Sequence, residues 1–151
     1  MATDTSQPKV ALVIGAGDAT GGAIARRFAR EGYIACVTRR SADKLQPLID
    51  SIRAEGGQAY GYGSDARKEE DVAALFAQIE AEHGPVEVMV FNIRANVPSS
   101  ILEEPARKYF EVWEVAGFSG VRNGQAAAPG RVRGGRGRTL CVDVRAAVRV
   151  S

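Results

Sequence analysis

The chain has 151 residues, 45% of them hydrophobic and 25% charged, which is the composition of an ordinary globular domain with one core. No apolar run approaches the ~20 residues that a membrane helix needs, and the polar N-terminus lacks a signal-peptide core, so we expect a cytoplasmic protein rather than a membrane or secreted one. The formal net charge of +2 is uneven, because residues 1–120 hold 13 basic and 17 acidic side chains whereas residues 121–151 hold seven arginines and one aspartate.

Short apolar runs alternate with amphipathic segments through the first 120 residues. The runs predict buried strands, and segments with apolar residues three or four positions apart predict helices. The expected strands are 10–14, 33–38, 58–62 and 86–91. The expected helices are 20–30, a second from Ser41 to Gly56-Gly57, 68–82, and 102–120 or somewhat beyond. Pro47 lies awkwardly in the second helix, which must therefore start after Ser41 or bend.

Four alternations of strand and helix predict an α/β fold with a Rossmann-like, doubly wound parallel sheet covered by helices on both faces. We expect this sheet to be incomplete on its C-terminal side, and an open edge beside the fourth strand to favour a homo-oligomer. Ligands of such sheets bind at the carboxyl ends of the strands. We therefore expect three parts in the chain: a disordered N-terminus (1–7), a Rossmann-like domain (8–120) and a basic C-terminal segment (121–151).

The basic C-terminal segment departs from the alternating pattern. Residues 126–138 have no helical or strand period, and 139–144 would suit a fifth strand. One interpretation is a reading frame that shifts near or after Gly120, which would explain the arginine-rich, lysine-free composition. Another is a real basic tail whose Arg-Gly stretch at 130–138 contacts RNA. No aromatic residue is interleaved there for base stacking, so a solvated segment without a nucleic-acid partner is the simpler interpretation.

The strand expected at 10–14 runs directly into a glycine-rich turn and then into a helix. A nucleotide pyrophosphate needs this order, because glycines let the backbone approach the phosphates and the first N–H groups of the helix point at their charge. The alternative is a tight turn that binds nothing. The residues expected to admit or line the pyrophosphate are Gly15, Gly17, Asp18, Ala19, Thr20 and Gly21.

The second expected strand ends at Thr38 and is followed by Arg39 and Arg40. An acidic residue at this place would accept hydrogen bonds from the adenosine ribose hydroxyls, as NAD requires. The planar fork of an arginine suits a 2′-phosphate instead. The arginine pair therefore predicts NADP rather than NAD, with a solvated basic loop as the alternative.

These features in this order resemble the N-terminal half of the short-chain dehydrogenase/reductase family, over residues 8–120. The family's T-G-x-x-x-G-x-G loop corresponds to Ile14-Gly15-Ala16-Gly17-Asp18-Ala19-Thr20-Gly21, with Ile for Thr and Ala for the middle Gly. The resemblance implies that Asp65 holds the adenine amino group, with Ala66 beside it. It also implies that Asn92 and Ile93, from the family's N-N-A-G motif, lie along the ribose and the nicotinamide. In this motif Arg94 stands for the Gly.

The resemblance further implies hydride transfer between a nicotinamide cofactor and a small carbonyl or alcohol substrate, with a serine and a Tyr-x-x-x-Lys pair as catalytic groups. No tyrosine of this chain is followed by lysine four residues later, and Lys108 is the last lysine. The Asn of the family's fourth helix is also missing near Gly117. We therefore assign no catalytic residue. We expect the chain as it stands to be inactive, or to be a nucleotide-binding module without chemistry.

The remaining chemistry-bearing residues predict no further site. Cys36 and Cys141 have no metal-ligand spacing, so no metal is expected, and both are interpreted as reduced, buried thiols. His83, the single histidine, closes an expected helix before Gly84. We interpret it as a helix cap or a solvated side chain rather than a catalytic base.

Overall fold

The computed structural model describes residues 8–93, 99–100, 102–134, 137–141 and 148–149. Its strands are β1 (Val10–Ile14), β2 (Ile34–Arg39), β3 (Gln58–Gly63), β4 (Val86–Phe91), β5 (Ser99–Ser100), β6 (Arg138–Cys141) and β7 (Val148–Arg149). Its helical segments are α1 (Thr20–Arg30), η1 (Ala42–Leu45), α2 (Gln46–Ala54), α3 (Glu69–His83), α4 (Ala106–Trp113), η2 (Glu114–Phe118) and α5 (Ser119–Gly134).

Five strands form one parallel sheet in the order β3-β2-β1-β4-β6, and β5 and β7 form a separate parallel pair. The predicted α/β fold with a Rossmann-like parallel sheet is confirmed. The expected open edge beside the fourth strand is wrong, because β6 pairs with β4 over Val88–Phe91. The predicted disorder of residues 1–7 lies outside the described residues.

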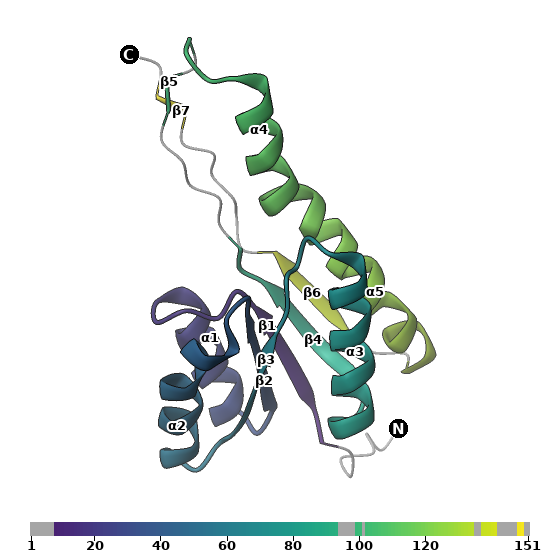
Figure 1. The fold of residues 1–151 in the computed structure, drawn as a ribbon. Helices are drawn as coiled ribbons and strands as arrows, with labels where there is room; N and C mark the ends of the chain where they lie inside the picture. The colour runs from purple at the N-terminus through teal and green to yellow at the C-terminus, as the bar shows by residue number, and fades with distance from the viewer. Residues whose placement is uncertain (1–7, 94–98, 101, 135–136, 142–147, 150–151) are drawn as a thin grey trace.

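Helices cover both faces of the sheet (Figure 1). Because side chains alternate along a strand, Ala11 and Val13 of β1 belong to the core under α1 and α2. Leu12 and Ile14 belong to a second core on the opposite face, under α3 and α5. All of β1 is buried, which accounts for its unbroken apolar sequence. The sheet is thus the middle of three layers.

Most element boundaries follow the sequence pattern, and β1, α1 and β4 have the predicted limits. Pro47 falls in the first turn of α2, where no intrahelical bond needs its missing N–H, and the short η1 precedes it. The prediction that the second helix starts after Ser41 is therefore confirmed. α3 has three acidic residues in its first turn, and it ends at Gly84, whose φ of 100° few other residues adopt.

The long helix predicted at 102–120 or somewhat beyond starts later in the structure and extends further than expected. α4 begins only at Ala106, η2 is a π-helical stretch, and α5 continues to Gly134 through Pro129. The Glu114 carbonyl oxygen accepts both the backbone N–H and the hydroxyl of Ser119, the latter at 2.7 Å. These two hydrogen bonds from Ser119 stabilise the widened π-helical turn.

The prediction that residues 126–138 lack helical structure is wrong as far as Gly134. Asn123 and Ala127 are completely or almost completely buried, so the packing of α5 against the sheet outweighs its weak local periodicity. The strand predicted at 139–144 is present as β6 up to Cys141. Residues 142–147 lie outside the described residues, as does the side chain of Cys141.

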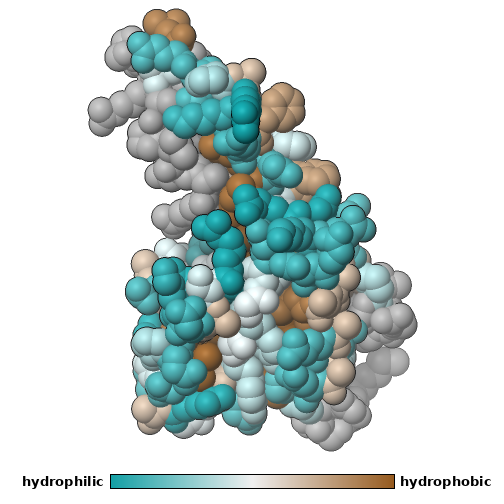
Figure 2. Space-filling view, viewed as in Figure 1, coloured by the Kyte–Doolittle hydropathy of each residue, from teal (hydrophilic) through white to brown (hydrophobic). Residues whose placement is uncertain are grey.

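α4 extends away from the sheet (Figure 1), and large apolar side chains of α4 are exposed. Phe110 is 66% exposed, and Trp113, the single tryptophan, is 50% exposed. The Trp113 ring stacks on Phe118 with centroids 5.6 Å apart. Figure 2 shows hydrophobic side chains among hydrophilic ones along this projecting part. Within the described ranges, no helix combines the length and apolarity that crossing a bilayer would require.

Candidate functional site

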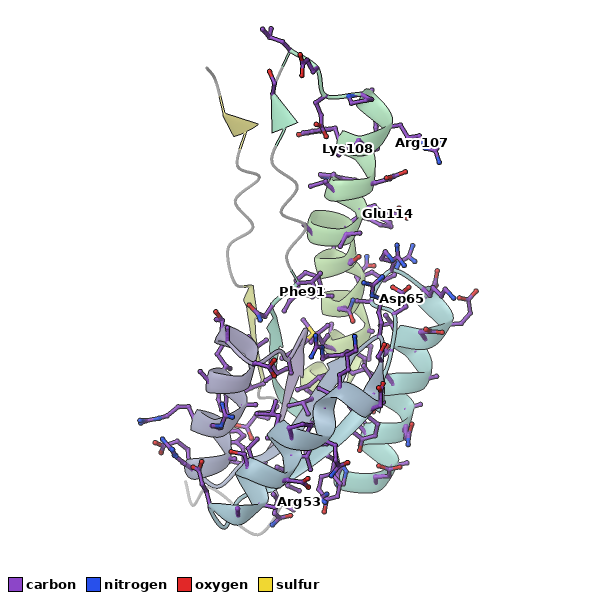
Figure 3. The ribbon with its side chains drawn as sticks, turned by 60° about the vertical axis from the view of Figure 1, so that its left-hand side comes forward. Arg53, Asp65, Phe91, Arg107, Lys108 and Glu114 are labelled. Carbon is purple, nitrogen blue, oxygen red and sulfur yellow. The ribbon has the colours of Figure 1, made fainter. Side chains whose placement is uncertain are left out.

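A cavity of about 460 Å³ lies at the carboxyl ends of β1 to β4, where parallel sheets bind ligands. Figure 3 shows Asp65 at this end of the sheet, near Glu114 of the long helix, and Arg53 at the opposite end. The lining residues come from four strand ends and from η2. They are Ile14, Gly15, Gly17, Thr38, Arg39, Arg40, Ser64, Asp65, Ala66, Arg67, Asn92, Ile93 and Val115.

The turn after β1 needs glycine at two positions. Gly15 has a φ of +86°, and a Cβ there would lie 2.4 Å from the Asn92 carbonyl oxygen. A Cβ on Gly21 would lie 2.5 Å from the Gly15 carbonyl oxygen. The N–H groups of Gly15 and Ala16 both donate to the Thr38 carbonyl oxygen, at 3.1 and 3.0 Å. The turn is therefore packed backbone to backbone, and its free side is bare main chain.

Asn92 fastens this turn to the end of β4. Its backbone N–H donates to the Ile14 carbonyl oxygen at 2.8 Å, and its Nδ2 donates to the Gly15 carbonyl oxygen at 3.0 Å. Its Oδ1 is buried and accepts no hydrogen bond from the described residues. A buried acceptor without a donor is costly, so a ligand N–H or O–H in the cavity would gain a ready partner there.

Arg39 and Arg40 lie at the end of β2, on the wall of the cavity. The Arg39 carbonyl oxygen accepts the Ser64 N–H at 3.0 Å, which ties the ends of β2 and β3 together. Neither guanidinium has a hydrogen-bond or ion-pair partner within the described part of the chain. Two uncompensated positive charges therefore stand beside the glycine turn.

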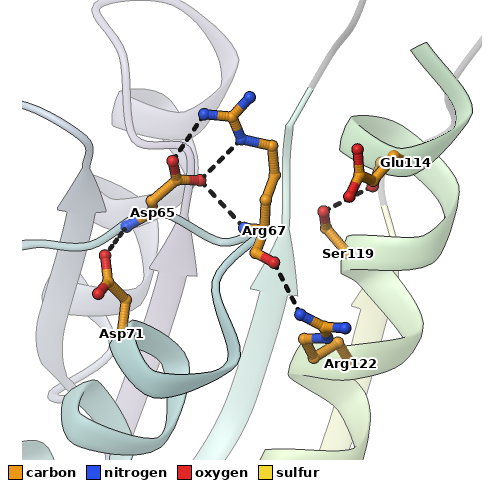
Figure 4. A network of polar contacts seen from close by, with 6 residues as sticks. All are labelled: Asp65, Arg67, Asp71, Glu114, Ser119 and Arg122. Carbon is orange, nitrogen blue, oxygen red and sulfur yellow. Dashed lines mark hydrogen bonds and ion pairs between the residues drawn. The ribbon is translucent and has the colours of Figure 1, made fainter. Parts of the chain in front are cut away.

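The loop after β3 carries Asp65, the one carboxylate among the described residues that line the cavity. Asp65 accepts from the backbone N–H, Nε and Nη2 of Arg67, at 3.1, 3.0 and 2.7 Å (Figure 4). These hydrogen bonds stabilise the charged carboxylate and lower the pKa of Asp65 to about 2. Beside it, the Ser64 hydroxyl is buried and has no partner among the described residues.

The sequence of the chain matches a known protein family. The sequence model of the family described as short chain dehydrogenase matches residues 9–149. The chain belongs to the short-chain dehydrogenase family. The match runs far into the basic segment, and the shifted-frame interpretation of that segment stays a prediction.

Individual relatives of this chain agree with the family match. It is 30% identical to the 7alpha-hydroxysteroid dehydrogenase of Escherichia coli over 139 residues, which are 92% of this chain and 54% of that enzyme. A short-chain dehydrogenase from Rhodopseudomonas palustris is 39% identical with a TM-score of 0.82, over 88% of this chain and 62% of that one. An actinorhodin polyketide ketoreductase with NADPH is 29% identical with a TM-score of 0.84, over 89% and 52%. The chain thus spans little more than half the length of these relatives.

Eight of the twelve site residues predicted from the sequence line the cavity. They are Gly15, Gly17, Arg39, Arg40, Asp65, Ala66, Asn92 and Ile93. Asp18, Ala19 and Thr20 are exposed at the start of α1, and Gly21 is buried beneath the turn. Sequence reasoning missed the remaining lining residues. Arg67 and Ser64 could have been found by their closeness to Asp65 along the chain, whereas nothing in the sequence singles out Val115.

His83 and Cys36 form part of a buried cluster that does not line the cavity. The His83 side chain is only 10% exposed, its Nε2 lies 2.9 Å from the Tyr62 hydroxyl, and its ring lies 4.2 Å from that of Tyr60. The interpretation of His83 as a solvated side chain is therefore wrong, because two tyrosines of β3 cover it. Cys36 is a buried free thiol as predicted, and burial raises its pKa to about 12.

The Asp65–Arg67 pair makes the stability of the protein depend on pH. The folded-state pKa of Asp65, about 2, lies below the ordinary value of 3.8. The stabilisation is therefore complete above roughly pH 4 and is lost as the pH falls toward 2. We expect Asp65→Asn to be less stable than the parent at neutral pH, with a difference in unfolding free energy that shrinks over this acid range. Urea unfolding at several pH values measures it.

The matched control for this experiment is Asp43→Asn, because Asp43 is exposed on η1. We expect its effect on the unfolding free energy to be small at every pH. A deficit of Asp65→Asn that stays constant from neutral pH to pH 2 would contradict the assignment of the pair.

Proposed function

We propose that this member of the short-chain dehydrogenase family binds NADP(H) in the cavity at the carboxyl ends of its strands. The observation that carries the proposal is the pair Arg39 and Arg40, which line the cavity and whose guanidinium groups have no partner among the described residues. In a site built for NAD, a carboxylate occupies this place and accepts the ribose hydroxyls. Two unpaired guanidinium groups favour a 2′-phosphate instead, since their N–H donors match its oxygens.

The other polar atoms of the cavity fit the rest of the dinucleotide. The bare backbone of Gly15 and Gly17 leaves room for the pyrophosphate. The N-cap residue of α1 is Ala19, which has no side-chain oxygen that would compete with a phosphate for the first N–H groups of the helix. Asp65 suits the adenine amino group, and the free Oδ1 of Asn92 suits a ribose hydroxyl. A bound nicotinamide supplies or accepts a hydride, and its partner in this family would be a small carbonyl or alcohol.

We do not propose that this chain catalyses hydride transfer by itself. The sequence holds no Tyr-x-x-x-Lys pair, which would place a proton donor and a pKa-lowering ammonium on one helix face. We therefore propose that the chain binds the cofactor without turning it over. The chain spans little more than half the length of the relatives described above. We therefore propose no reaction and no substrate for this chain by itself.

Calorimetric titration of the full chain tests the proposal. We expect NADPH to bind with a dissociation constant of about a micromolar and NADH at least about tenfold more weakly, because the 2′-phosphate contacts are missing. Absorbance of NADPH in the presence of small ketones is expected to stay constant. Absence of heat with both NADPH and NADP⁺, from protein with intact near-UV circular dichroism, would overturn the proposal.

Light scattering on the same solution tests the expected homo-oligomer. The chain has a mass of 16.0 kDa, and the exposed aromatic side chains of α4 and η2 are expected to bring at least two copies together. A clean monomer at micromolar concentration would remove this part of the proposal without affecting cofactor binding.

A further inference from the structure

We propose that Arg67 is a positioning residue that prepares Asp65 to read the adenine base. The inference rests on the proposed NADP(H) function, because it concerns the end of the same cavity that would hold the adenine. It goes beyond the motif residues, since Arg67 belongs to none of them. Arg67 acts through Asp65 and through the backbone of the loop, and both residues line the cavity.

The first argument is the number of acceptor positions left on the carboxylate. A carboxylate offers about four positions for hydrogen-bond donors. Oδ1 of Asp65 accepts two bonds, from the backbone N–H and Nε of Arg67, and Oδ2 accepts one from Nη2. One position therefore remains, on Oδ2, and the Asp65 side chain is only 15% exposed. An incoming N–H donor meets a carboxylate that is charged, fixed in orientation and open at one place.

The second argument is the support of the loop from α5. Arg122 Nη1 donates to the Arg67 carbonyl oxygen at 2.7 Å, and Nδ2 of the fully buried Asn123 donates to the Ala66 carbonyl oxygen at 3.2 Å. The Asp65 N–H donates to Asp71 Oδ2 at 3.1 Å. Figure 4 shows the contact of Asp71 from α3 and the contact of Arg122 from α5 with the loop. Because successive residues of the loop are held by their backbone, Arg67 keeps its position behind the carboxylate.

The third argument is the chemistry of the base. Adenine carries an exocyclic amino group, whose N–H donates to the one open position of Oδ2. Hypoxanthine carries an oxygen at the same place, which would face the carboxylate as a second acceptor. The buried Ser64 hydroxyl, without a partner among the described residues, adds a donor and acceptor for a ring nitrogen of either base. A carboxylate of fixed orientation therefore favours adenine over hypoxanthine, whereas a carboxylate that rotates freely discriminates less between the two bases.

The experiment compares NADPH with reduced nicotinamide hypoxanthine dinucleotide phosphate, whose base has an oxygen in place of the amino group and a hydrogen on the neighbouring ring nitrogen N1. Calorimetry gives the ratio of their dissociation constants for the full chain. We expect the parent to prefer adenine about tenfold, as for one hydrogen bond to a charged group. We expect Arg67→Ala to lower this ratio to about twofold, because Nε and Nη2 are lost while the backbone N–H stays. Arg67→Lys is expected to restore it to about threefold, since Lys offers one donor in place of two.

The control is Arg30→Ala. Arg30 donates through Nε and Nη2 to Glu55, at 3.0 and 2.8 Å, so the substitution removes the same two donors from an exposed pair that does not line the cavity. The ratio for Arg30→Ala is expected to equal that of the parent. Equal weakening of both cofactors by Arg67→Ala, with an unchanged ratio, is what a merely structural role predicts and would overturn the inference.

The remaining outcomes separate this inference from the proposed function. A parent chain that binds NADPH but shows no preference for adenine overturns the role of Arg67 and leaves the function standing. A folded parent chain that binds neither cofactor overturns both. If Arg67→Ala fails to fold, Arg67→Lys decides alone: a ratio reduced to about threefold supports the inference, and an unreduced ratio overturns it.

Discussion

Replacing Arg39 and Arg40 together by alanine is expected to raise the dissociation constant of NADPH by about a hundredfold. Both side chains line the cavity beside the glycine turn, and neither has a partner among the described residues. Their removal therefore leaves no buried carboxylate without a partner and breaks no ion pair among the described residues. The loss falls on the 2′-phosphate, which would exchange two charge-assisted contacts for water. The affinity for NADH, which lacks this phosphate, is expected to change by less than about threefold.

Arg26→Ala with Arg27→Ala provides the matched control. These two arginines are also adjacent in the sequence, but their side chains contact Ser51 and Glu31 and do not line the cavity. The double change removes the same net charge, so it corrects for general attraction of an anionic ligand. Calorimetry with NADPH and NADH on both double variants measures the four constants. If the change at 39 and 40 weakened the binding of NADPH and of NADH equally, the assignment of the 2′-phosphate site would be wrong.

Gly15→Ala is expected to lower the free energy of unfolding by about 3 kcal/mol and to abolish cofactor binding. The backbone of alanine at this position would first be strained, because a φ of +86° favours glycine. Its Cβ would also stand 2.4 Å from the Asn92 carbonyl oxygen and 2.9 Å from the carbonyl carbon. Both atoms are backbone at the end of β4, so relief requires the turn or the strand to move. Either movement displaces the main chain that the pyrophosphate would approach.

Gly56→Ala separates the two costs of that substitution. Gly56 has a φ of +84°, nearly that of Gly15, but a Cβ there would meet nothing within 4 Å. We expect it to cost about 1 kcal/mol and to leave NADPH binding unchanged. Chemical denaturation of both variants gives the difference, which belongs to the steric contact alone. Equal destabilisation by the two changes would show that the close packing against Asn92 is not what the turn requires.

The regular part of the fold could be predicted from the sequence because local pattern and tertiary environment agree there. The strand at 10–14 is apolar throughout, and both of its faces are buried. The π-helical stretch and the extension of the last helix could not be predicted. They depend on Ser119 reaching the Glu114 carbonyl and on Asn123 packing beneath the loop at 64–67, contacts that join distant parts of the chain or widen a turn locally.

The candidate site divides in the same way. Gly15, Arg39 and Asp65 follow strand ends, where topology alone predicts a ligand, and all three line the cavity. Arg67 was missed because its role depends on where its side chain turns, toward the Asp65 carboxylate rather than solvent. Val115 was missed because only the course of the long helix brings it over the sheet. Asp18 and Thr20, both exposed, show that a motif includes residues that belong to the turn without lining the cavity.

The single tryptophan gives this protein a native optical reporter. Trp113 is half exposed on the apolar side of the projecting helix, two residues before Val115 on the cavity wall. Covering of the aromatic side chains by a second copy would shift the indole emission to the blue. A reduced nicotinamide bound nearby would instead take up the excitation and emit at its own longer wavelength. Fluorescence of the unlabelled chain can therefore follow assembly and coenzyme loading as two separate signals in one cuvette.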